Sequence, residues 1–163
     1  MNPILKAENI ELINDINSSR SILIDKNQME QVIINLITNS IYALKEKQEK
    51  KMFLSSYTEN NRFFITLSDN GKGIDPEIRD KVFLPFFTTR KDGAGIGLTL
   101  SKNIVEAHGG YLSYQTYEDK TSFVICLIWY EFIFVKIWNF DKDFSQKFVS
   151  AFLSFRGTRN PRK

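Results

Sequence analysis

Two asparagines, Asn35 and Asn39, stand four residues apart in residues 29–44, a stretch whose apolar residues recur with helical spacing. Side chains four apart project next to each other from one face of a helix. Asparagine costs about half a kcal/mol relative to alanine inside a helix, so two of them suggest a function. Mg²⁺ accepts amide oxygens beside waters and substrate phosphates. The pair therefore indicates either a magnesium-phosphate site or a simply solvated helix flank.

A carboxylate, Asp69, ends an apolar row. In residues 63–69 every second residue faces the same side of a strand, and the other members of that row are Phe or aliphatic. Such a carboxylate is costly to bury unless a donor meets it, and the exocyclic amine of adenine is a suitable donor. Gly71 and Gly73 follow at once and would let a flat base approach the backbone. The alternative is a common Asp-Asn-Gly turn with an exposed carboxylate.

Three glycines, Gly93, Gly95 and Gly97, alternate with other residues in a basic, loop-like stretch. Alternating glycines let the backbone adopt positive φ and bring N–H groups close to a phosphate. The spacing lacks the Lys-Ser/Thr ending of a Walker loop, and it does not follow a strand as a dinucleotide fingerprint does. Taken alone, the run fits a phosphate cradle and a flexible surface loop equally well.

The composition favours one globular domain, since the chain has 163 residues and 42% of them are hydrophobic. The single cysteine, Cys126, excludes a disulfide framework and a cysteine-based metal site. The N-terminus lacks the layout of a signal peptide. The longest apolar stretch, residues 123–138, is interrupted by Glu131 and Lys136 and is too short to span a bilayer. We expect a soluble, cytoplasmic segment without membrane contact.

The net charge of +3 belongs to the C-terminal part of the chain. Residues 128–163 carry seven of the 22 basic residues but only three of the 19 acidic ones, so the rest is nearly neutral. A nucleic-acid surface on the main domain is therefore not expected.

The periodicity of the sequence predicts six strands and two helices. Residues 9–15 and 21–25 should form two neighbouring strands. A helix should follow from Met29, with Asp25 or Asn27 as its cap and its end within residues 45–51. The remaining predicted elements are a hairpin of residues 51–58 and 62–69, a helix over 98–108 ended by glycines, and strands over 111–117 and 121–127.

Four stretches in this order resemble the N, G1, F and G2 boxes of the ATP-binding catalytic domain of sensor histidine kinases: QVIINLITNSIYAL, DNGKGI, VFLPFFTTR and GAGIGLTLSKNIVEAHGG. That family belongs to a superfamily with DNA gyrase B, MutL and the large heat-shock chaperone ATPases. The resemblance covers roughly residues 8–127. It implies an α/β two-layer sandwich, a mixed sheet covered on one face by helices in a Bergerat-type ATP-binding fold. The domain is then 1–127, and 128–163 is an atypical aromatic and basic tail.

The resemblance also implies site residues, with ATP and Mg²⁺ as the cofactors. Asn39 matches the magnesium ligand, Asp69 the carboxylate that reads adenine, and Arg90 a cation that neutralises phosphate charge. The glycine run resembles the hinge of a lid, followed by a helix whose N-terminus faces the phosphates. Lys120 replaces a glycine of the family's last strand motif. The implied nucleotide contacts are Asn39, Asp69, Gly71, Gly73, Ile74, Phe86, Thr88, Thr89, Arg90, Lys91, Gly93, Ala94, Gly95, Ile96, Gly97, Leu98 and Thr121.

Asn35 distinguishes two kinds of activity within the superfamily. The resemblance places it where the hydrolytic ATPases have a glutamate that activates water, and an amide cannot act as a general base. The chain is therefore expected to donate the γ-phosphoryl group of ATP rather than to hydrolyse it, with Asn35 and Arg90 as catalytic residues. The alternatives are a hydrolytic ATPase and a degenerate nucleotide-binding module that docks on partners.

The phosphoacceptor is expected outside this chain. Its one histidine, His108, lies on the apolar face of its helix and precedes two glycines, which favours a structural role. The resemblance implies a dimerising phosphoacceptor domain, in the same parent protein or in trans, and a response regulator as indirect partner. The parent protein can be membrane-anchored.

The tail holds seven of the fourteen phenylalanines, and residues 140–155 space five of them as a helix would. It is either an amphipathic partner-binding helix or an extension without function.

Overall fold

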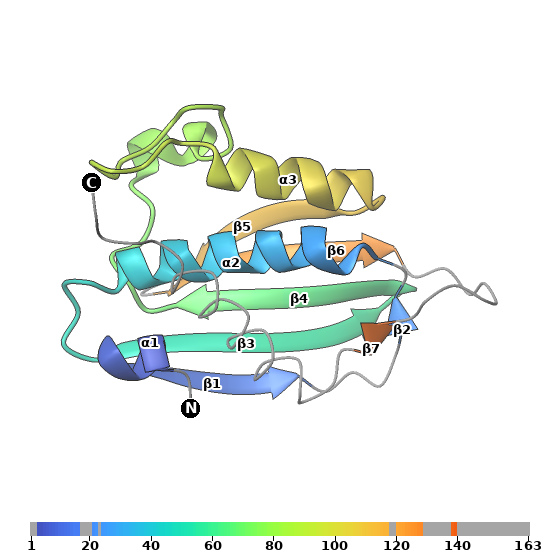
Figure 1. Ribbon diagram of the computed structural model, residues 1–163, viewed down its shortest axis with the longest axis horizontal. Helices are drawn as coiled ribbons and strands as arrows, with labels where there is room; N and C mark the ends of the chain where they lie inside the picture. Colours follow the sequence, from blue (N-terminus) through green and yellow to red (C-terminus); the bar gives the residue numbers. More distant parts are fainter. Residues whose placement is uncertain (1–2, 17–20, 23, 118–119, 129–137, 140–163) are drawn as a thin grey trace, which may run out of the picture.

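The computed structural model describes residues 3–16, 21–22, 24–117, 120–128 and 138–139 (Figure 1). They form a five-stranded sheet in the order β1-β3-β4-β6-β5, with α2 and α3 packed on one face. The elements are α1 (Pro3–Ala7), β1 (Ile10–Ile16), β2 (Ser21–Ile22), α2 (Lys26–Ala43), β3 (Lys50–Glu59), β4 (Arg62–Asp69), the 3₁₀ helix η1 (Pro76–Lys81), α3 (Gly97–Ala107), β5 (Tyr111–Tyr117), β6 (Lys120–Ile128) and β7 (Trp138–Asn139). Because β1 runs parallel to β3 and the other pairs in this sheet are antiparallel, the predicted mixed two-layer architecture is confirmed.

Helix α2 forms because one stripe of its surface is continuously apolar. Its stripe from Met29 to Ile37 is buried against the sheet, and the Asp25 carboxylate caps its start by accepting from the Gln28 N–H at 3.0 Å. The helix ends at Ala43, before the predicted 45–51. The Ala43 carbonyl, which has no partner within the helix, accepts a hydrogen bond from the Lys72 N–H at 3.1 Å. The loop after β4 thus supplies a donor for one of the carbonyls in the last turn of α2.

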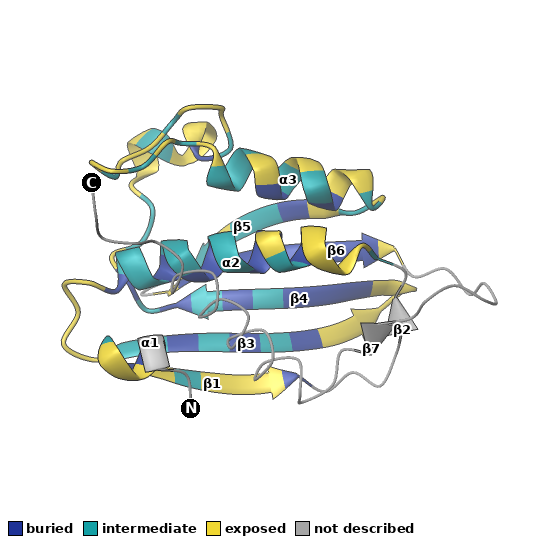
Figure 2. Ribbon diagram, in the orientation of Figure 1, coloured by how far each residue is buried: buried dark blue, intermediate teal, exposed yellow. Residues whose placement is uncertain are grey.

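The hairpin of β3 and β4 carries the core of the sheet. Its turn contains Asn60 and Asn61, both at positive φ, as a two-residue hairpin turn requires. The predicted alternation along β4 is confirmed, since Phe63, Ile65 and Leu67 are almost fully buried. In Figure 2 the strands under α2 are largely dark blue, whereas much of the edge strand β1 is yellow.

The predicted pairing of residues 9–15 with 21–25 is wrong. Strand β1 pairs with β3 instead, and β2 pairs antiparallel with β7 in a separate two-stranded sheet. Strand β2 comprises two described residues, and Asp25, the N-cap of α2, follows it closely in sequence. The sequence patterns also failed to predict α1 and η1, which are too short for a periodic signal. The helical spacing predicted for 140–155 lies outside the described residues.

His108 has the structural role expected of it. It caps α3, and Gly109 follows at positive φ. Its Nε2 accepts from the Asp25 N–H at 3.0 Å, so Nδ1 carries the proton and donates to the Ile104 carbonyl at 2.7 Å. Both ring nitrogens are thus engaged, and the imidazole ties the end of α3 to the start of α2.

None of the described helices is long and apolar enough to cross a membrane.

Candidate functional site

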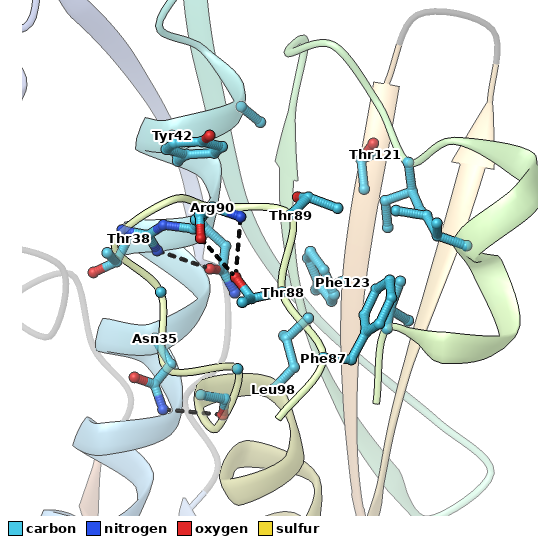
Figure 3. A pocket seen from close by; sticks show the side chains of 18 of the residues that line it. Asn35, Thr38, Tyr42, Phe87, Thr88, Thr89, Arg90, Leu98, Thr121 and Phe123 are labelled. Carbon is cyan, nitrogen blue, oxygen red and sulfur yellow. Dashed lines mark hydrogen bonds between the residues drawn. The ribbon is translucent and has the colours of Figure 1, made fainter. Parts of the chain in front are cut away.

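A cavity of about 270 Å³ lies between α2, the loop after β4, η1 and the segment 87–98 (Figure 3). We call residues 86–96 the lid segment. Most of the residues predicted from the sequence line this cavity: Asn35, Asn39, Asp69, Gly73, Ile74, Thr88, Thr89, Arg90, Gly93, Ala94, Gly95, Ile96, Gly97, Leu98 and Thr121. Four segments that are far apart in the chain therefore meet at one place.

Asp69 is the buried carboxylate of the cavity, with an exposed fraction of 1%. Its Oδ2 accepts from the Ser40 hydroxyl at 2.7 Å, and its Oδ1 accepts from the Gly71 N–H at 3.0 Å. Burial raises the pKa of Asp69, and these two hydrogen bonds lower it in part. Each carboxylate oxygen retains acceptor capacity for a ligand donor.

Gly71 does not line the cavity, and its backbone N–H donates to Asp69. A Cβ at this position would lie 2.6 Å from Asp69 Oδ1 and 2.7 Å from the Ala43 Cβ. The loop can therefore pass between α2 and the carboxylate only if residue 71 has no side chain.

Thr121 presents a polar atom that the rest of the described chain does not satisfy. Its hydroxyl is buried and has no hydrogen-bond partner among the described residues, although it belongs to a residue that lines the cavity. Strand register places Thr121 directly opposite Asp69. A buried acceptor and an unpaired hydroxyl side by side are suited to a ligand with both donor and acceptor atoms on one edge, such as a purine base.

The two asparagines of α2 have different surroundings. The Asn35 amide donates to the Gly97 carbonyl and to the Ser101 hydroxyl, each at 3.2 Å, so it joins α2 to the start of α3. Asn39 Oδ1 accepts from Nη1 of Arg90 at 3.4 Å. A cationic group therefore lies beside the oxygen that is predicted to bind Mg²⁺, and this oxygen accepts its hydrogen bond.

The lid segment turns sharply at two places. Phe86 has a φ of 62° and is 78% exposed, so its side chain does not line the cavity, and Phe87 lines it instead. Gly95 has a φ of 67°, and a Cβ there would lie 2.4 Å from the Phe86 carbonyl carbon. Lys91, also predicted as a contact, is exposed and outside the lining.

Helix α3 begins at the edge of the cavity with Gly97. No side chain in the described structure caps this end, and Ile96, Gly97 and Leu98 all line the cavity. The free N–H groups and the positive end of the helix dipole therefore face the cavity, an arrangement that favours an anion.

Several lining residues were not predicted. Two of them, Tyr42 and Lys72, carry a phenol and an ammonium group that could contact a ligand. Tyr42 lies one helical turn beyond Asn39, and Lys72 stands between the two glycines of the loop after β4. The spacing of Asn35, Asn39 and Tyr42 as i, i+4 and i+7 is the signal that could have found Tyr42. The other additions are Thr38, Ala43, Ile78, Val82, Phe87 and Phe123.

Residues 24–130, well over half of the chain, match the family described as Histidine kinase-, DNA gyrase B-, and HSP90-like ATPase. The chain belongs to this family. The resemblance to histidine kinase catalytic domains noted from the four boxes is thereby confirmed.

Curated relatives of this family member are sensor kinases. Sensor histidine kinase ZraS of Salmonella typhimurium is 38% identical over 96 residues, which are 59% of this chain and 20% of that kinase. Sensory histidine kinase/phosphatase NtrB of Escherichia coli O157:H7 is 31% identical over 130 residues, 74% of this chain and 37% of the relative. The chain therefore spans only a minor part of the length of these relatives.

Solved structures of the same kind share the fold. The catalytic domain of histidine kinase ThkA, in a nucleotide-free form, superposes with a TM-score of 0.68 at 27% identity, covering 77% of this chain and 84% of that one. ThkA in complex with the response regulator protein TrrA gives a TM-score of 0.65 at 26% identity, covering 77% of this chain and 36% of the other. The predicted fold class is confirmed.

The raised pKa of Asp69 predicts a specific pH dependence of stability. A carboxyl whose pKa is higher in the folded state contributes stability below its unfolded pKa, and this contribution is lost as the pH rises through the folded pKa. As the pH rises from about 4 to about 7, the free energy of unfolding of Asp69→Asn should therefore increase relative to that of the wild type. Urea unfolding at the two pH values measures this difference.

Asp80→Asn, at an exposed aspartate outside the cavity lining, is the matched control for the same chemical replacement. An Asp69→Asn offset that does not change with pH, or that changes in the opposite direction, contradicts the inferred environment of the carboxylate.

Proposed function

We propose that this domain binds Mg²⁺-ATP in the cavity and donates the γ-phosphoryl group to a histidine on another segment or chain. The observation that carries the proposal is a single cavity lined both by the buried Asp69 carboxylate and by Asn39 with the uncapped start of α3. We call the first group the adenine end and the second the phosphate end, because they suit the two chemically different parts of an adenine nucleotide. The family and its sensor-kinase relatives support the same assignment.

The adenine end is formed by Asp69, Thr121 and apolar lining residues such as Ile74. We propose that the exocyclic amine of adenine donates to the Asp69 carboxylate. Guanine has a carbonyl at the same ring position, and that carbonyl would face an acceptor and bind less well. The hydrogen bonds from Ser40 and Gly71 fix the orientation of the carboxylate before the base arrives. The unpaired Thr121 hydroxyl gains a partner from the ring nitrogens in this arrangement.

The phosphate end is formed by Asn39, Arg90 and the start of α3. Asn39 would hold a Mg²⁺ ion, which would supply positive charge to the phosphate oxygens. Arg90, whose guanidinium donates to Asn39 Oδ1, would supply a second positive charge beside the same phosphates. The N–H groups at Gly97 supply further donors at the cavity edge.

Asn35 favours transfer over hydrolysis. Its amide nitrogen donates both to the Gly97 carbonyl and to the Ser101 hydroxyl, and a carboxylate, which lacks N–H donors, could not make the first of these contacts. No general base is placed at this position, so water is not activated there. We therefore infer phosphoryl transfer as the activity and hydrolysis as the weaker side reaction.

The acceptor histidine is proposed to lie on a dimerising helical domain, in the parent protein or in trans. His108 uses both ring nitrogens within the fold, so it is not free to attack a phosphate. A response regulator is the proposed indirect partner, by analogy with the ThkA complex with TrrA. We place this segment of the protein in the cytoplasm.

The assignment of Asn39 predicts a metal-dependent affinity. Asn39→Ala should abolish most of the gain in ADP affinity that Mg²⁺ produces, while leaving metal-free ADP binding largely intact, because the adenine end is unchanged. Calorimetric titrations with ADP in Mg²⁺ and in EDTA measure the ratio. Asn103→Ala, an exposed asparagine on α3, is the control. An unaltered ratio in Asn39→Ala refutes the ligand role.

Transfer itself is tested with a separate acceptor. Alone with Mg²⁺-ATP, the chain should turn over slowly and form no acid-labile phosphoprotein, because its one histidine, His108, already uses both ring nitrogens within the fold. Addition of a dimerising hairpin that carries the acceptor histidine should label the hairpin, weakly because the two parts meet only at bulk concentration. Rapid ATP hydrolysis without labelling of the hairpin at any concentration would instead support the ATPase alternative.

A further inference from the structure

The ring of Tyr42 lies at the rim of the cavity and is surrounded by cations from three separate segments. The Nζ of Lys45, which follows α2, is 5.3 Å from the ring centroid. The Nζ of Lys72, in the loop after β4, is 5.1 Å away. The Cζ of Arg90, from the lid segment, is 4.9 Å away, and Figure 3 places the Arg90 guanidinium beside this ring.

Like charges near one ring repel each other, and the cation-π attraction of each exposed pair is only about 0.5–1 kcal/mol. None of the three cations forms a salt bridge with a carboxylate in the described parts of the chain. The cluster is therefore a concentrated positive charge that an anionic ligand would stabilise.

The cluster lies on the phosphate side of the cavity. Tyr42 shares a face of α2 with Asn35 and Asn39, and Arg90 contacts both Asn39 and the Tyr42 ring. Lys72 and Arg90 themselves line the cavity. The ring thus contacts cations from both the lid segment and the loop after β4, next to Asn39, which is assigned to the phosphate end.

We propose that Tyr42 is a positioning residue for phosphate recognition: its ring holds Lys45, Lys72 and Arg90 so that their charges converge on the polyphosphate of the nucleotide. The inference rests on the proposed function, since it takes the cavity to be the ATP site. It assigns to the aromatic ring, rather than to its hydroxyl, the task of keeping long flexible cations in place, which lowers the entropy lost when they bind a phosphate.

The test compares a nucleoside with its triphosphate in metal-free buffer. Tyr42→Leu removes the ring and leaves all three charges, whereas Tyr42→Phe keeps the ring. The exposed Tyr117→Leu, on β5, is a matched loss of tyrosine away from the cavity. By calorimetry, Tyr42→Leu should weaken ATP roughly tenfold and leave adenosine unchanged, and the other two variants should match wild type.

Inorganic tripolyphosphate is the second probe, because it carries the charge without the base. It should bind wild type and Tyr42→Phe more tightly than Tyr42→Leu. The proposal is overturned if Tyr42→Leu weakens adenosine and ATP equally, if it retains full affinity for ATP and tripolyphosphate, or if Tyr42→Phe behaves like Tyr42→Leu. If wild type binds tripolyphosphate but does not bind adenosine, the assignment of the cavity as an ATP site is overturned. The role of Tyr42 is then still tested by comparing the tripolyphosphate affinity of wild type with that of Tyr42→Leu. No binding of either probe by wild type overturns both.

Discussion

The arrangement around the cavity depends on keeping one carboxylate, Asp69, out of water at the end of β4. Burial of an ionised carboxylate is costly unless donors surround it, and here the Ser40 hydroxyl and the Gly71 N–H supply two of them. Both donors require close approach of α2 to the loop that follows β4. The contact of Gly71 with Ala43 and the hydrogen bond from Lys72 to the Ala43 carbonyl fix that approach. Burial raises the pKa of Asp69, and these hydrogen bonds only partly offset that effect. Because Asp69 also lines the cavity, its carboxylate can meet a further donor there.

From this fixed point, α2 arranges the rest of the site along a single face. Asn35 binds the start of α3, Asn39 contacts Arg90, and Tyr42 gathers the cations at the rim. These side chains therefore link α2 to α3, to the lid segment and to the loop after β4. Ser40, on the same helix, holds the Asp69 carboxylate, so one helix contacts each of the groups assigned to the nucleotide in the proposed function.

Local periodicity was sufficient to predict most of the fold. The stripe of α2, the alternation of β4 and the hairpin turn at Asn60 and Asn61 are local patterns, and the structure has each of them. The parallel pairing of β1 with β3 was not predicted, because nothing within residues 9–25 specifies a partner that lies more than thirty residues away. Within the site, the four boxes located the cavity, yet Phe87 rather than Phe86 lines it because the backbone at Phe86 has positive φ. The cations around Tyr42 could not be predicted from local sequence patterns either, because three separate segments supply them.

The most direct measurement of the central claim is the affinity of ADP for wild type and for Asp69→Asn by titration calorimetry, with Asp80→Asn as the matched control. Replacing the acceptor by an amide places a donor against the exocyclic amine of adenine, so Asp69→Asn should lose affinity by at least about tenfold. Asp80→Asn should bind like wild type. Equal ADP affinity in wild type and Asp69→Asn would contradict the account, because the buried carboxylate would then have no part in nucleotide binding.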